Sequence, residues 1–202
     1  HPEEPEKGQI VIKDNGEGMD YDTLSTAWLE IGTSYKDDLR KDENKKRTEK
    51  YKRNRLGEKG IGRLGDHRLG REIEIITRKD KQEYIMTINW DNIEDTVYIE
   101  DIYVFIEERE PREFISESGT KITIKRLRVQ WTRKMVRDCA RAIMSLNSPF
   151  DSNDSFMVDF KIENSDWLKG LLSFDDIKDY KLFSFDVTCS GNSITDFFYE
   201  FT

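Results

Sequence analysis

The sequence predicts an α+β fold built on an antiparallel or mixed sheet, followed by the start of a second domain. Several segments between residues 71 and 127 are rich in β-branched and aromatic residues and are separated by polar turns, which is typical of strands. Apolar residues at helical spacing occur before and after these segments. A chain of 202 residues is long enough for one domain with a sizeable core and part of another.

A strand and a short helix are expected first. Residues 9–14 alternate between polar and apolar and then meet Asn15 and Gly16, so we expect a strand that ends in a loop. Helical spacing follows, with Asp20 or Asp22 at the helix start and Gly32 at its end. The apolar stripe of this helix consists of Leu24, Ala27, Trp28 and Ile31.

The sheet is completed by four further strands, expected at residues 71–78, 82–90, 102–108 and 120–127. A helix from about Thr132 to Leu146 follows. Its predicted apolar face contains Met135, Val136, Cys139, Ala140, Ile143 and Leu146. Residues 156–162 are predicted to return as a strand.

The pattern changes beyond about residue 165, to a short helical segment at 174–180 and two strand-like segments at 180–188 and 194–201. We therefore expect one domain at residues 1–165 and the beginning of a downstream α/β domain at 166–202. The strand pattern runs to the last residues, which indicates that the full protein continues.

Residues 36–55 have a composition that cannot form a core. They contain ten Lys or Arg and five Asp or Glu, with almost no apolar side chain. A solvated linker has this composition, and so has a lid whose positive charge faces a polyphosphate. The position between two candidate ligand motifs favours the lid.

The overall composition excludes some classes of function. A formal net charge of −8 argues against a protein whose whole surface binds nucleic acid, because phosphate binding needs clustered positive charge. No apolar stretch approaches the roughly 20 residues of a membrane span, and residues 1–8 lack the features of a signal peptide. We therefore expect a soluble, cytoplasmic protein without membrane contact. Cys139 and Cys189 lack metal-binding spacing, so we expect two buried free thiols and no metal site in this chain.

The first candidate site is residues 14–19, DNGEGM, at the end of the first strand. We expect Asp14 to present a buried carboxylate that can accept a hydrogen bond from an exocyclic amine, and Gly16 and Gly18 let the backbone approach a flat ring, which suits adenine. The same residues are also an ordinary turn signature. A calcium loop does not fit, because Ser25 stands where such a loop needs a bidentate Glu.

The second candidate site is residues 57–65, GEKGIGRLG. Closely spaced glycines leading into a helix present N–H groups and the positive end of the helix dipole to phosphate oxygens, and Lys59 and Arg63 add charge. A dinucleotide-binding loop does not fit, because no apolar strand precedes it. A Walker loop does not fit either, because Arg63 and Leu64 replace its Lys and Ser or Thr.

The third candidate site is Ser118, Gly119 and Thr120 at the start of a strand. Such a sequence is usually only a tight strand entry. A threonine hydroxyl that faces the same site as Asp14 can, however, hold a water against a base.

Together, these three motifs and the charged segment between the first two resemble the GHKL ATPase superfamily, which includes gyrase B, the ninety-kilodalton heat-shock chaperone, histidine kinases and MutL. The resemblance covers roughly residues 9–165, and residues 31–36, IGTSYK, are most similar to the MutL-like and chaperone-like members. It implies the Bergerat fold, a two-layer α/β sandwich with a mixed, mainly antiparallel sheet. ATP would lie between the helix layer and the lid.

The resemblance also implies roles for individual residues. Asp14 would take the adenine amine, Gly18 and Met19 would line the base, and Thr120 would support a water bound to adenine. The other ATP-binding residues that it implies are Gly16, Thr33, Ser34, Lys36, Gly57, Lys59, Gly60, Ile61 and Gly62.

One part of the family pattern does not occur in this chain. The family places a helix before the first strand, with an Asn that helps to hold magnesium and, in hydrolysing members, a Glu that activates water. We expect both residues upstream of residue 1. Glu3, Glu4 and Glu6 are expected to be solvated charges rather than substitutes for them.

The expected function is ATP binding, with magnesium-dependent hydrolysis in the intact protein that drives lid closure and a conformational or dimerisation switch. One alternative is a nucleotide-gated interaction module without hydrolysis, and another is an α+β domain in which all three motifs are turns. A histidine kinase is less favoured, because we find no dimerisation helix with a phosphoacceptor, and His67 is expected to pack. Expected partners are ATP, a second copy of the protein in an ATP-dependent homodimer, and nucleic acid or a client protein bound through other domains.

Overall fold

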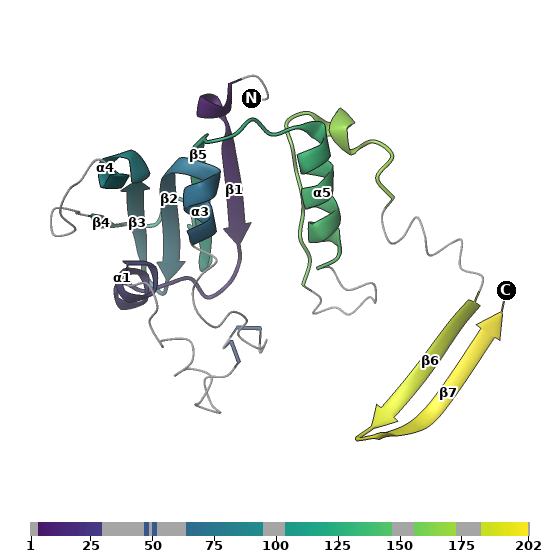
Figure 1. Cartoon of the computed structure of the whole chain (residues 1–202). Helices are drawn as coiled ribbons and strands as arrows, with labels where there is room; N and C mark the ends of the chain where they lie inside the picture. Colours follow the sequence, from purple (N-terminus) through teal and green to yellow (C-terminus); the bar gives the residue numbers. More distant parts are fainter. Residues whose placement is uncertain are drawn as a thin grey trace. The chain divides into compact units, whose positions relative to one another are not determined.

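The computed structural model describes residues 4–29, 47–48, 50–51, 64–94, 104–146, 156–172 and 183–201. It divides into two compact units, His1–Trp131 and Thr132–Thr202 (Figure 1). The first unit contains a five-stranded sheet with short helices, and the second contains a helix and a β-hairpin. The predicted domain boundary at residue 165 stays a prediction.

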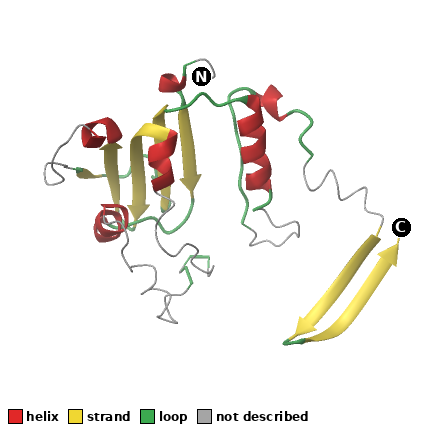
Figure 2. Ribbon diagram, viewed as in Figure 1, coloured by secondary structure: helices red, strands yellow, loops and turns green. Residues whose placement is uncertain are grey.

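The sheet of the first unit has the strand order β1-β5-β2-β3-β4. Its strands are β1 (Gln9–Asp14), β2 (Gly70–Lys79), β3 (Gln82–Asn89), β4 (Ile106–Arg109) and β5 (Gly119–Leu127). Each of the pairings between these strands is antiparallel. Strand β5 lies between the first strand and β2, so residues more than 100 positions apart in the sequence become neighbours (Figure 2).

Short helices accompany this sheet and form a second layer. They are α1 (Tyr21–Leu29), α3 (Leu64–Leu69) and α4 (Trp90–Glu94), and the 3-10 turn η1 (Pro5–Lys7) precedes β1. In Figure 1, α3 lies in front of β2 and β5, and it contacts both strands. The predicted α+β fold with a mainly antiparallel sheet is therefore confirmed.

The hydrophobic core lies between α1 and the sheet. Leu24 of α1 is fully buried against Ile73 and Ile75 of β2 and Met86 and Ile88 of β3. Burial of each side chain of this kind stabilises the fold by about 1.5–3 kcal/mol. The strands alternate, so their other residues form the opposite face of the sheet, which combines charged side chains such as Glu74 and Lys125 with the buried Ile76 and Thr123.

Local chemistry explains where α1 and the β2–β3 hairpin begin and end. Asp20 caps α1, since its Oδ1 accepts the Thr23 N–H at 2.8 Å. Partial burial alone would raise the pKa of Asp20, but hydrogen bonds from Thr23 and Lys79 outweigh this effect and lower it to about 2. The turn between β2 and β3 contains Asp80 at a φ of 58°, a conformation that Asp tolerates better than most residues.

The second unit contains α5 (Arg133–Met144) and the 3-10 turn η4 (Ser165–Leu168). Thr132 caps α5, and Arg137 donates hydrogen bonds to the carbonyls of Trp167 and Lys169 at 3.0 and 2.8 Å. The hairpin of β6 (Phe183–Ser190) and β7 (Ser193–Phe201) matches the two strands that the sequence predicts. None of the helices in the described ranges is long and apolar enough to cross a membrane.

Three expectations about local structure are wrong. Residues 156–162 form no strand, because they pair with no described neighbour and Met157 is 79% exposed. On the predicted apolar face of α5, Val136 and Ala140 are buried but Leu146 is exposed, because it lies beyond the end of the helix. Cys139 and Cys189 are free thiols, but Cys139 is only partly buried and Cys189 is exposed on the hairpin.

One further expectation needs different bounds, and another concerns residues that the structure does not describe. The strand expected at 102–108 is shorter in its described part and shifted toward the C-terminus, since β4 starts at Ile106. The helix expected at 174–180 lies outside the described residues.

Candidate functional site

The first and third sequence motifs meet at one end of the sheet. Asp14 is the last residue of β1 and lies directly opposite Thr120 of β5. It is exposed and not buried as expected, because β1 is an edge strand of the sheet. Oδ1 of Asp14 accepts the Gly16 N–H at 2.8 Å and the Thr120 N–H at 3.2 Å. No hydrogen bond to the second oxygen, Oδ2, occurs within the described part of the chain, so an exposed carboxylate oxygen in a fixed orientation remains available as an acceptor.

Close packing explains the glycines of the first motif. Gly18 has a φ of +70°, and a Cβ at this position would lie 1.8 Å from the carbonyl oxygen of Arg78 in β2. Only glycine combines this φ with this approach. The hydroxyl of Ser118 donates to the Gly16 carbonyl at 2.7 Å, which ties the loop after β1 to the entry of β5.

Thr77 connects three parts of the site. Its fully buried hydroxyl accepts the Met19 N–H at 2.9 Å and donates to the Gly119 carbonyl at 3.1 Å. It also lies 3.1 Å from the hydroxyl of Thr120. Thr77 is not among the residues predicted from the sequence, where the available signal is a threonine on the same face of a strand as two isoleucines, Ile73 and Ile75.

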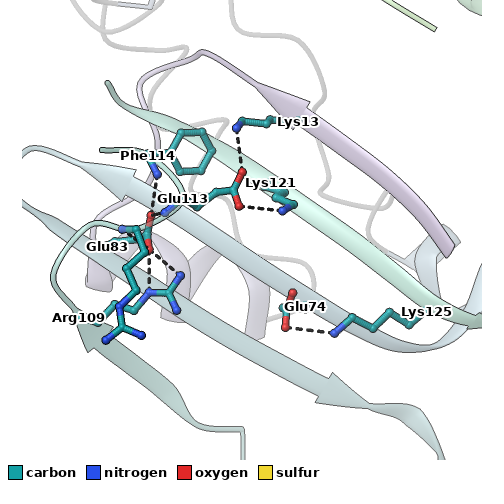
Figure 3. Close-up of polar contacts among 9 residues, drawn as sticks. Lys13, Glu74, Glu83, Arg109, Glu113, Phe114, Lys121 and Lys125 are labelled. Carbon is teal, nitrogen blue, oxygen red and sulfur yellow. Dashed lines mark hydrogen bonds and ion pairs between the residues drawn. The ribbon is translucent and has the colours of Figure 1, made fainter. Parts of the chain in front are cut away.

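The segment before Gly119 is anchored by a buried carboxylate (Figure 3). Glu83 of β3 is 0% exposed, and its oxygens accept the backbone N–H groups of Arg112, Glu113 and Phe114 at 3.2, 3.0 and 2.9 Å. Arg109 completes the arrangement with Nε and Nη2 each 2.7 Å from Oε1. Burial alone would raise the pKa of Glu83, but these hydrogen bonds lower it below its ordinary value.

The same segment packs against the site from the far side of the sheet. Phe114 is 1% exposed, and a Cβ on Gly119 would lie 2.6 Å from its ring, so this position also requires glycine. Glu113 accepts hydrogen bonds from Lys13 and Lys121, each at 2.8 Å (Figure 3). Thus β1, β3 and β5 jointly fix the chain that enters Gly119 and Thr120.

Part of the charged segment 36–55 contacts the first motif. Nζ of Lys50 donates to the Asn15 carbonyl at 2.6 Å, and the Lys50 N–H donates to Oε1 of Glu17 at 3.1 Å. The hydroxyl of Tyr51 donates to the same Asn15 carbonyl at 3.3 Å. These contacts attach the described end of this segment to the loop that follows Asp14.

Several predicted site residues lie outside the described part of the chain: Thr33, Ser34, Lys36, Gly57, Lys59, Gly60, Ile61 and Gly62. Helix α3 begins at Leu64, within the last residues of the glycine-rich segment 57–65. Within α3, His67 packs edge-to-face on Trp90 at 4.9 Å between ring centroids, which agrees with the expected packing role.

Glu4 and Glu6, the described acidic residues before β1, are remote from Asp14, and Glu3 lies outside the described residues. Glu4 pairs with Lys7, and Glu6 pairs with Arg71 and Arg126, each at 3.2 Å. A strand rises about 3.3 Å per residue, so the two ends of β1 are roughly 17 Å apart. Among the described residues, no group of three or more His, Cys, Asp or Glu side chains is arranged to hold a metal ion.

Comparison with known proteins identifies the family of this chain. Residues 1–120 match the family described as "Histidine kinase-, DNA gyrase B-, and HSP90-like ATPase". The chain belongs to this family. Membership implies that its first unit is an ATP-binding domain of the GHKL type.

A curated relative shows similarity over a longer range. The protein named "Putative type II restriction enzyme HgiDII", from Herpetosiphon aurantiacus, is 28% identical over 161 residues. The alignment covers 72% of this chain and 25% of the relative, so the chain spans about a quarter of the length of that protein.

Proposed function

We propose that this chain binds ATP at the end of the sheet where Asp14 and Thr120 meet, and that the intact protein hydrolyses it. One structural observation is the main support for this proposal. The β1–β5 register brings together the first and third motifs, which are 106 residues apart, and leaves one carboxylate oxygen of Asp14 available as an acceptor. Family membership supports the same ligand.

The base would be held by groups whose positions are already fixed. Oδ2 of Asp14 would accept a hydrogen bond from the 6-amino group of adenine. Gly16, Gly18 and Met19 would line the ring, and Thr120 would support the adenine directly or through a water. Two hydrogen bonds orient the Asp14 carboxylate before any ligand arrives, which reduces the entropic cost of binding.

The phosphates would be held by the glycine-rich segment at residues 57–62, with Lys59 supplying positive charge. Thr33, Ser34 and Lys36 would contact the nucleotide from the start of the lid, as in MutL-like and chaperone-like relatives. The contacts of Lys50 with Asn15 and Glu17 support a lid that is attached beside the base site.

Hydrolysis would require magnesium and a general base. Glu6 is a poor candidate for this base, because two arginines hold it at the opposite end of β1. We therefore expect the base and the magnesium ligand to come from the helix that precedes β1 in hydrolysing members of the family. Lid closure and ATP-dependent dimerisation would follow from nucleotide binding.

The relative from Herpetosiphon aurantiacus favours nucleic acid over a client protein as the partner of the intact protein, because that relative is named as a putative restriction enzyme. The net charge of −8 supports contact with DNA through other domains rather than through this chain as a whole. DNA-stimulated phosphate release by the full-length protein tests this assignment. A rate that does not change with added duplex would contradict it.

The binding proposal is tested by titrating ATP into the wild-type chain and the Asp14→Asn variant. The amide of Asn keeps one acceptor oxygen but presents N–H groups where Oδ2 stood, so we expect ATP affinity to fall at least 100-fold while the fold is kept. Asp22→Asn in the first turn of α1 is the matched control and should bind as the wild type does. Equal affinity of the wild type and Asp14→Asn would refute the assignment.

Turnover separates hydrolysis from nucleotide-gated binding. The full-length protein with ATP and magnesium should release phosphate. Stable ATP binding without phosphate release would instead establish a non-hydrolysing interaction module.

A further inference from the structure

We propose that Thr77 is a positioning residue that fixes the direction of the Thr120 hydroxyl proton, so that Thr120 meets the base as a hydrogen-bond acceptor. This inference rests on the ATP-binding function proposed above. Thr77 lies in β2, directly opposite Thr120 in the register of the sheet. Its side chain is fully buried, so it acts on a ligand only through its neighbours.

The Thr77 hydroxyl carries a single proton. A hydroxyl donates one hydrogen bond and accepts two. The Gly119 carbonyl only accepts, so Thr77 gives its proton to that oxygen at 3.1 Å. The Met19 N–H only donates, so it occupies one lone pair of Thr77 at 2.9 Å.

Only one assignment then remains for the contact between the two threonines. Their hydroxyl oxygens lie 3.1 Å apart, and Thr77 has already used its proton. All three hydrogen bonds form together only when Thr120 donates to Thr77. The proton of Thr120 is thereby held toward the buried interior, and its lone pairs remain for a ligand.

This arrangement gives the base site a defined polarity. Asp14 and Thr120 are opposite residues of β1 and β5, so their Cβ atoms are about 4.5–5.5 Å apart on one face of the sheet. Oδ2 of Asp14 and Oγ1 of Thr120 both act as acceptors. Two acceptors suit the amino group at position 6 of adenine and disfavour a carbonyl oxygen at the same position, as in hypoxanthine.

Thr77 also fixes two backbone groups of the site. The Met19 N–H and the Gly119 carbonyl belong to the two motifs on either side of the proposed base site, and both form hydrogen bonds with the Thr77 hydroxyl. Loss of this hydroxyl would leave a buried N–H without its acceptor and would let the Thr120 proton turn toward the ligand. We therefore expect both affinity and base selectivity to depend on Thr77.

The experiment measures dissociation constants of ATP and inosine triphosphate for the wild-type chain, Thr77→Val and Thr77→Ser. Thr77→Val keeps the shape but removes the hydroxyl, and we expect about tenfold weaker ATP binding and an ATP preference over inosine triphosphate reduced about tenfold. Thr77→Ser keeps the hydroxyl and should stay within about threefold of the wild type in both quantities.

Thr123→Val is the matched control. Thr123 is 5% exposed and lies in β5 like Thr120, but it belongs to the opposite face, and its hydroxyl takes part in none of the side-chain hydrogen bonds of the described ranges. It should bind both nucleotides as the wild type does. If Thr77→Val does not fold, Thr77→Cys takes its place, because a thiol hydrogen-bonds only weakly and the same losses are expected.

The outcomes separate this inference from the proposed function. Wild-type binding with unchanged affinity and selectivity in Thr77→Val overturns the role of Thr77 and leaves ATP binding intact. Lower stability of Thr77→Val without a change in base preference also overturns it, since Thr77 would then be only structural. Absence of ATP binding by the wild type refutes the proposed function and this inference together.

Discussion

Replacement of Glu83 by glutamine tests how the entry to Gly119 and Thr120 is held. The carboxylate receives Arg109 and the Arg112 N–H on Oε1, and the N–H groups of Glu113 and Phe114 on Oε2. A glutamine has one acceptor oxygen and one NH₂ group. In either orientation, its NH₂ faces two or more donors that then lose their acceptor.

The expected cost follows from these contacts. Each buried donor without a partner costs about 1–3 kcal/mol, and breaking a buried ion pair costs about 3–5 kcal/mol. Since Glu83 is 0% exposed, we expect Glu83→Gln to lower the free energy of unfolding by about 3 kcal/mol or more. For an m-value of about 1–3 kcal/mol/M, the urea midpoint then falls by roughly 1–3 M.

Glu113→Gln provides the matched control in the same segment. Glu113 also accepts two charged donors, Lys13 and Lys121, but its side chain is 23% exposed and receives no backbone N–H in the described contacts. We expect a cost below about 1 kcal/mol. Urea titrations of the wild type, Glu83→Gln and Glu113→Gln measure these free energies of unfolding. A Glu83→Gln variant whose free energy of unfolding lies within about 0.5 kcal/mol of that of Glu113→Gln would refute the reasoning.

The pH dependence of Glu83 has a definite sign. Its folded pKa lies below the ordinary value of 4.5, so its contribution is fully present above that pH and is lost as the pH falls further. The stability difference between the wild type and Glu83→Gln should therefore be constant above about pH 5 and should shrink below pH 4. A difference that grows on acidification would contradict this assignment.

Two further predictions concern the loop after β1 and the helix that follows it. Asp20→Ala removes the cap of α1 and should cost about 1 kcal/mol at pH 7 in a urea titration. Because the pKa of Asp20 is about 2 in the folded protein, the stabilisation by its carboxylate should decrease below pH 4. A stability difference between the wild type and Asp20→Ala that is unchanged at pH 2 would argue against the cap. Gly18→Ala should lower the thermal midpoint by several degrees, because its Cβ would lie 1.8 Å from the Arg78 carbonyl. Gly65→Ala, which meets no atom within 4 Å in α3, should leave the midpoint unchanged or raise it.

Strand periodicity predicted the sheet well, because the inward positions of β2 and β3 are occupied by large apolar residues. Ile73, Ile75 and Met86 are buried as the alternation requires. The same rule failed at residues 156–162, where an alternating segment has no described strand beside it. Periodicity reports a preference for extended structure, whereas a strand needs a partner whose position depends on the whole fold.

The site was predictable at residues whose chemistry is visible in the sequence. Asp14 and Thr120 were predicted because a turn motif followed by a Gly-Thr strand entry resembles the order of motifs in the GHKL superfamily. Thr77 and Glu83 carry no such local signal, and their importance comes from contacts across 42 and 31 positions of sequence. Register between strands decides these contacts, and a single sequence does not specify register directly.

The most direct test of ATP binding at Asp14 and Thr120 is a titration of ATP into the isotope-labelled chain, followed by amide NMR. We predict saturable shifts of the Gly16, Met19 and Thr120 amides, with little change at Leu127 at the far end of β5. Saturable shifts confined to that far end, or an absence of shifts at millimolar ATP, would contradict the proposed site.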